Sequence, residues 1–202
     1  MQTLLPEISL NVSAPIIDPH GLFLHRPEEI WLEIGFGGGE HLAHQASIHR
    51  DVGFFGCEPF INGAAKLLST VAALKLENVR VHTGDAVELI DCLPAASISC
   101  IYLLYPDPWP KRRQRKRRLV SDESLLQLAR ILKPDGTLKF ATDIDDLAAW
   151  TLARILRSQE FSWNVGSSKD WLQPWHDWPG TRYELKAMEA GRPCAYFTFE
   201  RN

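Results

Sequence analysis

The chain has 202 residues, of which 45% are apolar and 23% are charged, and its formal net charge at pH 7 is −3. These values are typical of a soluble globular protein of one domain with a substantial core. No stretch reaches the roughly 18 apolar residues that cross a membrane, and the first ten residues lack a basic segment and a long apolar run. We therefore expect a cytoplasmic protein without a membrane partner.

Residues 1–29 are interrupted by four prolines, so we expect an irregular N-terminal arm there and a single domain over 30–202. Five short apolar runs predict strands, in chain order at 30–39 (closing in a glycine turn), 52–58, 78–82, 97–105 and 137–142. Helices are expected at 39–48, at 60–75, after 83–86, from Ser121 to the break at 133–136, and at 145–158. Two further strand-like runs, at 161–165 and 195–200, flank a polar, Trp-rich loop that contains 180–184.

Alternating strands and helices predict an α/β fold with a mostly parallel sheet. A glycine or a carboxylate stands at the end of each of the first five strands: Gly35, Glu58, Asp85, Asp107 and Asp143. Ligands of such sheets bind outside the carboxyl ends of the strands. We therefore expect these five residues to gather along one edge and to mark the functional site.

The glycine loop that begins at Glu33 has the form E-x-G-x-G-x-G. A dinucleotide site needs G-x-G-x-x-G, and Glu40 stands where the third glycine would be counted from Gly35. The loop instead resembles the first motif of S-adenosylmethionine-dependent methyltransferases. The alternative is a plain tight turn.

Glu58 follows the second strand, where a carboxylate can accept both hydroxyls of an adenosine ribose. That contact suits NAD as well as S-adenosylmethionine, so Glu58 indicates an adenosine without choosing the chemistry. Asp85 suits the adenine amino group, and its alternative is an ordinary Asp in a strand-end turn.

Three prolines alternate with Tyr105, Asp107 and Trp109 in residues 105–110. Each proline fixes its own φ and favours extended geometry in the residue before it, so we expect a stiff extended segment. Asp107 is the candidate catalytic residue because its position is fixed and nearby cations favour its ionised form. The alternative is an Asp-Pro turn. Tyr105 and Trp109 suit either stacking on a base or packing.

The next eight residues, 111–118, hold seven cations and Gln114. The remaining 15 Lys and Arg stand against 25 Asp and Glu, so the rest of the chain carries a charge of −10. A basic segment on an acidic body favours a localised phosphate site, and the alternative is a solvated run of surface charge. The candidate RNA-binding residues are Arg112, Arg113, Arg115, Lys116, Arg117 and Arg118.

The cysteines and histidines show no metal-ligand spacing, so we expect reduced cysteines and no metal site. The four cysteines are Cys57, Cys92, Cys100 and Cys194.

Six pieces of the chain, in order, resemble the bacterial tRNA (guanine-N7-)-methyltransferase family, often called TrmB. They are LEIGFGGG, GCEPFINGAAK, NVRVHTGDA, YPDPWPKRRQRKRR, LKPDGTLKFATD and GTRYE, and they extend over most of the chain after the arm. The resemblance implies a Rossmann-like class I methyltransferase. Its sheet has seven strands, mostly parallel with an antiparallel last strand, and helices cover both faces.

The resemblance also implies an activity, the transfer of a methyl group from S-adenosylmethionine to N7 of the variable-loop guanine at position 46 of tRNA. The resemblance implies that Glu33, Glu58, Asp85 and the Asp107 region hold the cofactor and that Asp107 is the catalytic residue. Gly35, Gly37, Gly39 and Ala86 are further candidate cofactor-binding residues. The implied contacts to the target guanine or tRNA are Lys111, Asp143, Thr181, Arg182, Tyr183 and Glu184. We expect tRNA as the partner, no metal, and either a monomer or a homodimer.

Two features depart from the family. Gln114 stands where the family commonly has His, and the arm holds one Arg and no Lys where the family usually has a basic segment. Both departures concern parts of the chain that are expected to bind tRNA.

The chemistry needs no general base, because guanine N7 carries a lone pair and no proton. We expect Asp107 to orient the base and to favour the positive charge that builds on it. Asp143 and Glu184 are candidate acceptors for guanine N1 and the exocyclic amine. Three rival hypotheses remain: a non-catalytic RNA-binding module, an NAD-linked oxidoreductase, and a methyltransferase acting on a small molecule or a protein.

Overall fold

The computed structural model describes residues 4–202, in which seven strands form one sheet of order β3-β2-β1-β4-β5-β7-β6. The strands are β1 (Ile30–Ile34), β2 (Gly53–Cys57), β3 (Val79–His82), β4 (Ile98–Leu104), β5 (Leu132–Thr142), β6 (Phe161–Ser162) and β7 (Ala195–Arg201). The first five pair in parallel, and β7 pairs antiparallel with β5 and β6. The expected seven-stranded sheet with an antiparallel last strand is therefore confirmed.

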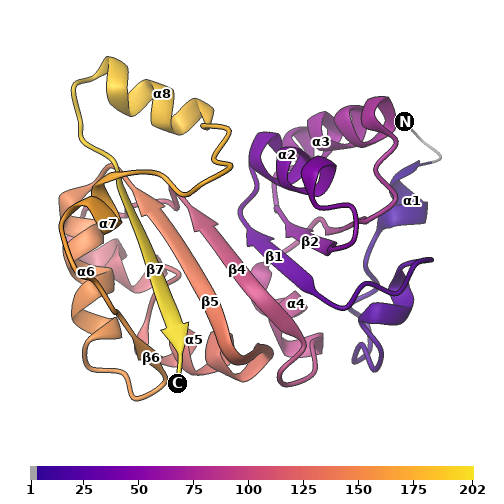
Figure 1. Ribbon diagram of the computed structural model, residues 1–202, viewed down its shortest axis with the longest axis horizontal. Helices are drawn as coiled ribbons and strands as arrows, with labels where there is room; N and C mark the ends of the chain where they lie inside the picture. Colours follow the sequence, from indigo (N-terminus) through magenta and orange to yellow (C-terminus); the bar gives the residue numbers. More distant parts are fainter. Residues whose placement is uncertain (1–3) are drawn as a thin grey trace.

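Helices cover both faces of this sheet (Figure 1). They are α1 (Leu4–Ile8), α2 (Glu40–Ile48), α3 (Ile61–Leu74), α4 (Ala86–Cys92), α5 (Asp122–Ile131), α6 (Asp145–Ile155), α7 (Lys169–Leu172) and α8 (Arg182–Glu189). Two 3-10 segments, η1 (His20–Leu22) and η2 (Arg112–Arg117), complete the elements. The sheet order reverses between β1 and β4, which makes the carboxyl ends of these two strands the expected place for a ligand.

Apolar side chains form a separate core on each face of the sheet. On one face, α2 and α3 bury residues such as Leu42 and Leu67 against Phe54 of β2. On the other, α4, α5 and α6 pack against β1, β4 and β5. Each fully buried side chain of this size contributes roughly 1.5–3 kcal/mol, so both cores hold the strand ends in place.

The helix starts follow from local capping. Ser121 accepts from the backbone N–H of Ser124, whose hydroxyl bonds back to the Ser121 N–H, and two acidic residues occupy the first turn of α5. Asp85 caps α4 in the same way through the Val87 N–H. The expected helix cap at Ser121 is therefore confirmed.

The N-terminal arm is more ordered than the sequence predicted. It contains α1 and η1, and the backbone N–H of Leu10 donates to the Val81 carbonyl at 2.7 Å, so the arm follows the β3 edge of the sheet. Ile8 and Phe23 are buried in the two cores. Pro6 lies within α1 and Pro19 directly precedes η1, so the prolines do not prevent short helical segments or the packing of the apolar side chains between them.

Some expected boundaries were wrong. β5 begins at Leu132, with a register shift opposite residues 98–100, because 133–136 bulges from a strand that has already started. β6 has only two residues and α6 ends at Ile155. The largest difference is α8, which begins at Arg182 inside the segment predicted as loop.

Candidate active site

Two cavities with shared walls lie at the carboxyl ends of the strands, and a third lies beside them between α4 and α5. Figure 1 shows α8 beyond the arrowheads of β4 and β5, across this edge from α2 and α3. A cavity of about 210 Å³ is lined by residues that include Gly35, Gly37, Glu58, Tyr105, Asp107 and Tyr183. A second, of about 280 Å³, shares Gly37, Glu58, Phe60 and Tyr183 with it, and a third, of about 450 Å³, shares Leu119 and contains Asp85. We call the first two cavities, together with the neighbouring third, the active-site groove.

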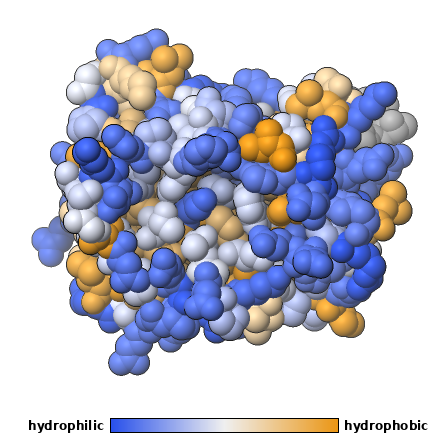
Figure 2. Space-filling view, viewed as in Figure 1, coloured by the Kyte–Doolittle hydropathy of each residue, from blue (hydrophilic) through white to orange (hydrophobic). Residues whose placement is uncertain are grey.

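The surrounding surface is mostly polar. Figure 2 shows apolar residues as separate spots on a largely hydrophilic face. Phe60, which lines two of the cavities, is 73% exposed, so the groove offers an apolar contact at its rim.

The glycine loop forms one wall of the groove and needs glycine for two reasons. Gly35 and Gly37 have φ angles of 74° and 56°, in the left-handed region that other residues rarely adopt. A Cβ on Gly35 would meet nothing within 4 Å, so the backbone there borders open space that a ligand can enter. Gly39 differs, because a Cβ there would lie 2.7 Å from Leu67 of α3. Gly39 thus serves helix packing, although the sequence placed it at the cofactor.

Glu58 is held rigidly beside this loop. It is 5% exposed, and its Oε2 accepts from the Gly37 N–H at 2.8 Å while Oε1 accepts from the Phe60 N–H at 3.0 Å. Each carboxylate oxygen has further lone pairs, so both can still accept from a ligand in the groove. The expected acceptor for ribose hydroxyls therefore stands in a cavity with the glycines.

The carboxylates of Asp85 and Glu33 differ in exposure and in their hydrogen-bond partners. Asp85 lines the third cavity and also caps α4 through the Val87 N–H at 2.9 Å, so the two readings of this residue are compatible. Ala86 behind it is buried. Glu33 is buried, and its Oε2 lies 2.7 Å from Nδ1 of buried His41. The Glu33 carboxylate thus bonds another buried side chain and does not line the cavities described above.

Asp107 is an exposed residue of a mostly half-buried segment, residues 105–110, which we call the platform. It lines the same cavity as Gly35 and Glu58. The expected extended geometry was wrong at two positions: Tyr105 and Trp109 have φ angles of 49° and 40°. Such values are outliers for bulky residues and cost on the order of 1–3 kcal/mol each.

Long-range contacts explain this conformation. The Tyr105 N–H donates to the Ala141 carbonyl of β5 at 2.8 Å, and the Tyr105 ring stacks on Tyr183 of α8 with centroids 6.5 Å apart. The guanidinium carbon of Arg117 lies 4.8 Å from the centroid of the Trp109 ring. These contacts override the local preference that each proline imposes on its predecessor.

The basic segment forms η2 and divides into two sets of side chains. Arg112, Arg113, Lys116 and Arg117 are exposed, as is Lys111 before them. Arg115 is half-buried and bonds Asp146 of α6 at 2.9 Å. Arg118 is buried, although the sequence placed it among the candidate RNA-binding residues. Within the described residues Nη1 of Arg118 has no hydrogen-bond partner, but the guanidinium bonds Asp146 and the Pro108 carbonyl inside the protein and is not presented to RNA.

The remaining predicted substrate residues belong to α8 and to the end of β5. Arg182 and Tyr183 line the groove, and Thr181 caps α8 by accepting from the Glu184 N–H at 3.1 Å. Asp143 Oδ2 accepts from Arg192 at 2.7 Å. Arg182 and Tyr183 thus lie at the groove and Thr181 adjoins them in the chain, whereas Asp143 follows β5 and lines none of the three cavities.

Glu184 departs from its predicted role. It is 5% exposed and accepts from the Trp178 indole N–H at 2.7 Å and from the Tyr196 hydroxyl. The capping box Thr-x-x-Glu could have revealed this from the sequence, since Glu at the third helical position bonds back to the cap. Trp178 and Tyr196, which hold Glu184, were missed because only the fold brings them together.

Within residues 4–202, no group of three or more His, Cys, Asp or Glu side chains is placed to hold a metal ion. Over the same residues, no helix combines the length and apolarity that crossing a bilayer requires. The four cysteines are free thiols, and burial raises the pKa of Cys57 to about 12.

The architecture is that of methyltransferases of known structure. The fold superposes on an rRNA methylase from Streptococcus thermophilus with a TM-score of 0.57 and 14% identity, covering 95% of this chain and 99% of that one. A SAM-dependent methyltransferase from Aquifex aeolicus gives 0.55 and 13%, with 86% and 82% covered. The chain therefore has the Rossmann-like methyltransferase fold, with the groove at the strand ends described above.

Sequence similarity narrows this class to one family. A family model described as "Putative methyltransferase" matches residues 27–196. The tRNA (guanine-N(7)-)-methyltransferase of Agrobacterium fabrum is 49% identical over all of this chain and 87% of its own length, and that of Roseobacter denitrificans is 51% identical over 92% and 78%. The chain belongs to the family of tRNA (guanine-N(7)-)-methyltransferases.

Proposed function

We propose that this protein transfers a methyl group from S-adenosylmethionine to N7 of a guanine in tRNA, the variable-loop guanine at position 46, with Asp107 as the catalytic carboxylate. One observation carries the proposal: Asp107 shares a cavity with the open glycine backbone at Gly35 and with the fixed carboxylate of Glu58. Donor and acceptor can therefore meet in one place, and the exposed cations of the basic segment lie next along the chain.

The groove offers contacts that suit the sulfonium end, the ribose and the adenine of the methyl donor. When bound, S-adenosylmethionine supplies an electrophilic methyl group on a sulfonium centre. Gly35 and Gly37 leave room beside the backbone, and Glu58 offers two fixed oxygens to the ribose hydroxyls. Asp85 lines the third cavity and suits the adenine end, with Ala86 next to it as the first residue of α4.

Asp107 acts on the target base. Guanine N7 presents an in-plane lone pair and no proton, so the residues must align N7 with the methyl group and manage charge, without removing a proton. Positive charge builds on the purine as the bond forms, and a fixed carboxylate stabilises it. The aromatic faces of Tyr105 and Tyr183, which lie beside Asp107, suit stacking on a base taken out of the RNA fold.

Further contacts to the guanine or its nucleotide come from residues beside the groove. Asp143 keeps acceptor capacity beyond its bond to Arg192 and suits the guanine N–H groups. Lys111, Thr181 and Arg182 suit the neighbouring phosphate and sugar. Glu184 contributes indirectly, because its capping box sets the first turn of α8.

The exposed cations of the basic segment bind the tRNA phosphates. They are Arg112, Arg113, Lys116 and Arg117. The groove is formed entirely by one chain, which is compatible with action as a monomer or a homodimer. A tRNA substrate favours the cytoplasm as the compartment of the reaction, which is also the sequence-based expectation.

The test is methyl transfer from labelled S-adenosylmethionine to an unmodified tRNA transcript, followed by nucleoside analysis. We expect 7-methylguanosine as the labelled product, and none from a matched transcript in which the guanine at position 46 is replaced by adenine. Label in another nucleoside would contradict the chemistry. Label retained in the substituted transcript would contradict the site within tRNA.

A further inference from the structure

Arg118, the last cation of the basic segment, is directed into the protein. Its side chain is 1% exposed. Its Nε–H donates to the Pro108 carbonyl at 2.8 Å, its Nη2 bonds Asp146 of α6, and its guanidinium carbon lies 4.8 Å from the Trp150 ring centroid. One side chain therefore connects the platform to the first two turns of α6.

The Pro108 carbonyl is one residue away from the Asp107 side chain. Within residues 4–202, the bond from Arg118 is the one hydrogen bond that reaches the main chain of 106–110. On either side of Asp107, Tyr105 and Trp109 hold left-handed backbone conformations. Such conformations persist only where the surrounding structure enforces them, so the platform depends on outside contacts.

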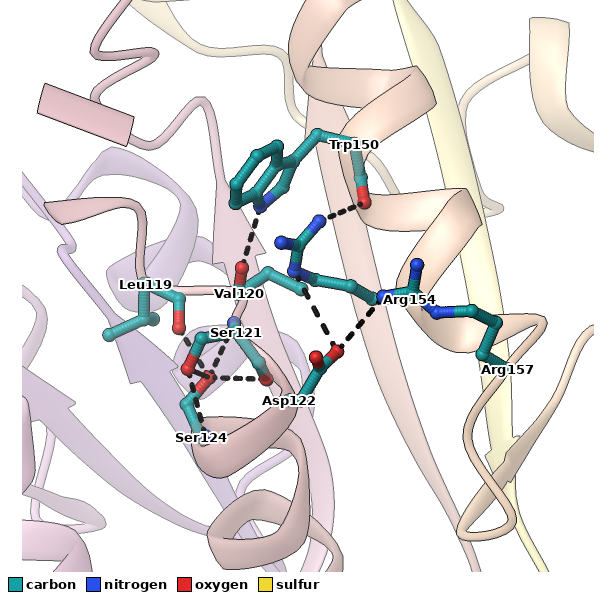
Figure 3. Close-up of polar contacts among 8 residues, drawn as sticks. All are labelled: Leu119, Val120, Ser121, Asp122, Ser124, Trp150, Arg154 and Arg157. Atoms are coloured by element: carbon teal, nitrogen blue, oxygen red, sulfur yellow. Dashed lines mark hydrogen bonds and ion pairs between the residues drawn. The ribbon is translucent and has the colours of Figure 1, made fainter. Parts of the chain in front are cut away.

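The partners of Arg118 are themselves fixed. The Trp150 indole N–H donates to the Val120 carbonyl at 2.8 Å, which ties α6 to the segment before α5 (Figure 3). Asp146 also binds Arg115, whose side chain is 37% exposed. A guanidinium can bond a carbonyl and a carboxylate at once through its rigid fork, which a lysine cannot reproduce.

We propose that Arg118 is a positioning residue, which holds the Asp107 platform in place for methyl transfer through Pro108 and is itself held by Asp146 and Trp150. Its sequence neighbour Arg117 is exposed and packs on the outer side of the platform at Trp109. The two adjacent arginines thus have separate roles, one in alignment and one at the RNA surface. The inference rests on the proposed role of Asp107.

Arg154 of α6 provides a matched control. Its guanidinium carbon lies 3.3 Å from the centroid of the same Trp150 ring. Figure 3 shows its other contacts, which are the Trp150 carbonyl and Asp122, where Arg157 also converges. Loss of Arg154 removes a guanidinium from the same indole without removing a bond to the platform.

The test compares Arg118→Met, Arg118→Lys, Asp146→Asn, Arg154→Met and Asp107→Asn. For each protein, kcat is measured with tRNA and S-adenosylmethionine both saturating, and is divided by the active fraction from S-adenosylmethionine binding stoichiometry. The dissociation constant for tRNA is measured over a series of salt concentrations. These readouts separate alignment, folding and phosphate binding.

We expect Arg118→Met to lower kcat by roughly 10- to 100-fold, because small displacements of a catalytic group have effects of that size. The tRNA dissociation constant and its salt slope should stay at their wild-type values. Arg118→Lys should not restore kcat, although it keeps the charge. Asp146→Asn should lower kcat less, and Arg154→Met should leave it unchanged.

A weaker tRNA affinity with a smaller salt slope and normal kcat would make Arg118 a phosphate ligand and overturn the proposal. An equal kcat loss in Arg154→Met would also overturn it, because the effect would then be general to the Trp150 cluster. Should the Arg118 variants fail to fold, Asp146→Asn at a half-exposed site carries the test, and a normal kcat there overturns the proposal. If Asp107→Asn turns over normally, the assignment of Asp107 fails; if it is inactive while Arg118→Met is normal, only the positioning role fails.

Discussion

The two halves of the active-site groove hold their carboxylates by different means. In the donor half, at the ends of β2 and β3, Glu58 and Asp85 accept from backbone N–H groups close by. In the RNA half, at β5, α6 and α8, Asp143, Asp146 and Glu184 bond side chains that are distant in sequence, such as Arg192 and Arg118. The donor half is therefore set by backbone geometry and the RNA half by tertiary side-chain pairs.

The difference matters because the proposed mechanism gives the two halves different tasks. A small methyl donor needs a preformed cradle, which a backbone fixed by glycines and caps supplies. An RNA substrate needs a surface of cations and a catalytic group that stays aligned while the RNA is held. Arg118 and Arg117 illustrate the division within two consecutive residues.

The largest expected effect comes from Asp107→Asn, which keeps the shape of the side chain and removes its charge. Turnover should fall by roughly 10²–10³-fold or more, the size of effect seen when a preorganised electrostatic group is lost. S-adenosylmethionine binding, measured by calorimetry, should be unchanged, because the donor half stays intact. Asp51→Asn, an exposed carboxylate before β2, is the matched control and should behave as wild type. Near-normal turnover of Asp107→Asn would remove the catalytic assignment.

A smaller effect, confined to the donor half, is expected for Glu58→Gln. The substitution weakens the bonds to Gly37 and Phe60 and replaces a ribose acceptor, and hydrogen bonds to charged groups contribute about 1.5–3 kcal/mol. S-adenosylmethionine should therefore bind about 10- to 100-fold more weakly. The affinity for tRNA should not change. Loss of tRNA affinity with normal donor affinity would show that the two halves are not separate.

Glu184→Gln tests the RNA half as a folding unit. Glu184 is buried and accepts from Trp178 and Tyr196, so the free energy of unfolding in urea should fall by about 1–3 kcal/mol. Tyr196→Phe, which removes one of the donors, should act in the same direction. Full stability of Glu184→Gln with a selective loss of methylation would instead make Glu184 a direct guanine contact.

The smallest expected effect is on the reactivity of the cysteine thiols. This reactivity measures how readily a reagent reaches the interior of each half of the groove. Burial raises the pKa of Cys57, at the end of β2, to about 12, so this thiol stays protonated well above neutral pH. Half-buried Cys194, before β7, should react sooner with a thiol reagent at pH 8. Peptide mapping of the labelled protein checks the order, and faster labelling of Cys57 would mean that the donor half opens readily.

The sequence predicted the donor half better than the RNA half. Gly35, Glu58 and Asp85 were found because each lies at the end of a readable strand, and strand ends of a parallel sheet meet at one edge. The sheet and its antiparallel last strand followed from the alternation of elements and the family resemblance. These features depend on local pattern.

Features that depend on tertiary pairing were missed. Nothing near Arg118 in the sequence shows that Asp146 will bury it, and the turned backbone at Tyr105 arises from contacts with β5 and α8. Glu184 is an intermediate case, because its capping box is visible in the sequence while its Tyr196 partner is not.

The central claim is that the exposed cations hold tRNA while the platform sets the rate. The most direct test replaces Arg112, Arg113 and Lys116 by alanine and measures both tRNA affinity against salt and the single-turnover rate at saturating tRNA. The account predicts that the salt slope of log affinity falls by roughly two to three and that affinity weakens, with the saturated rate unchanged. An unchanged slope together with a reduced saturated rate would contradict it.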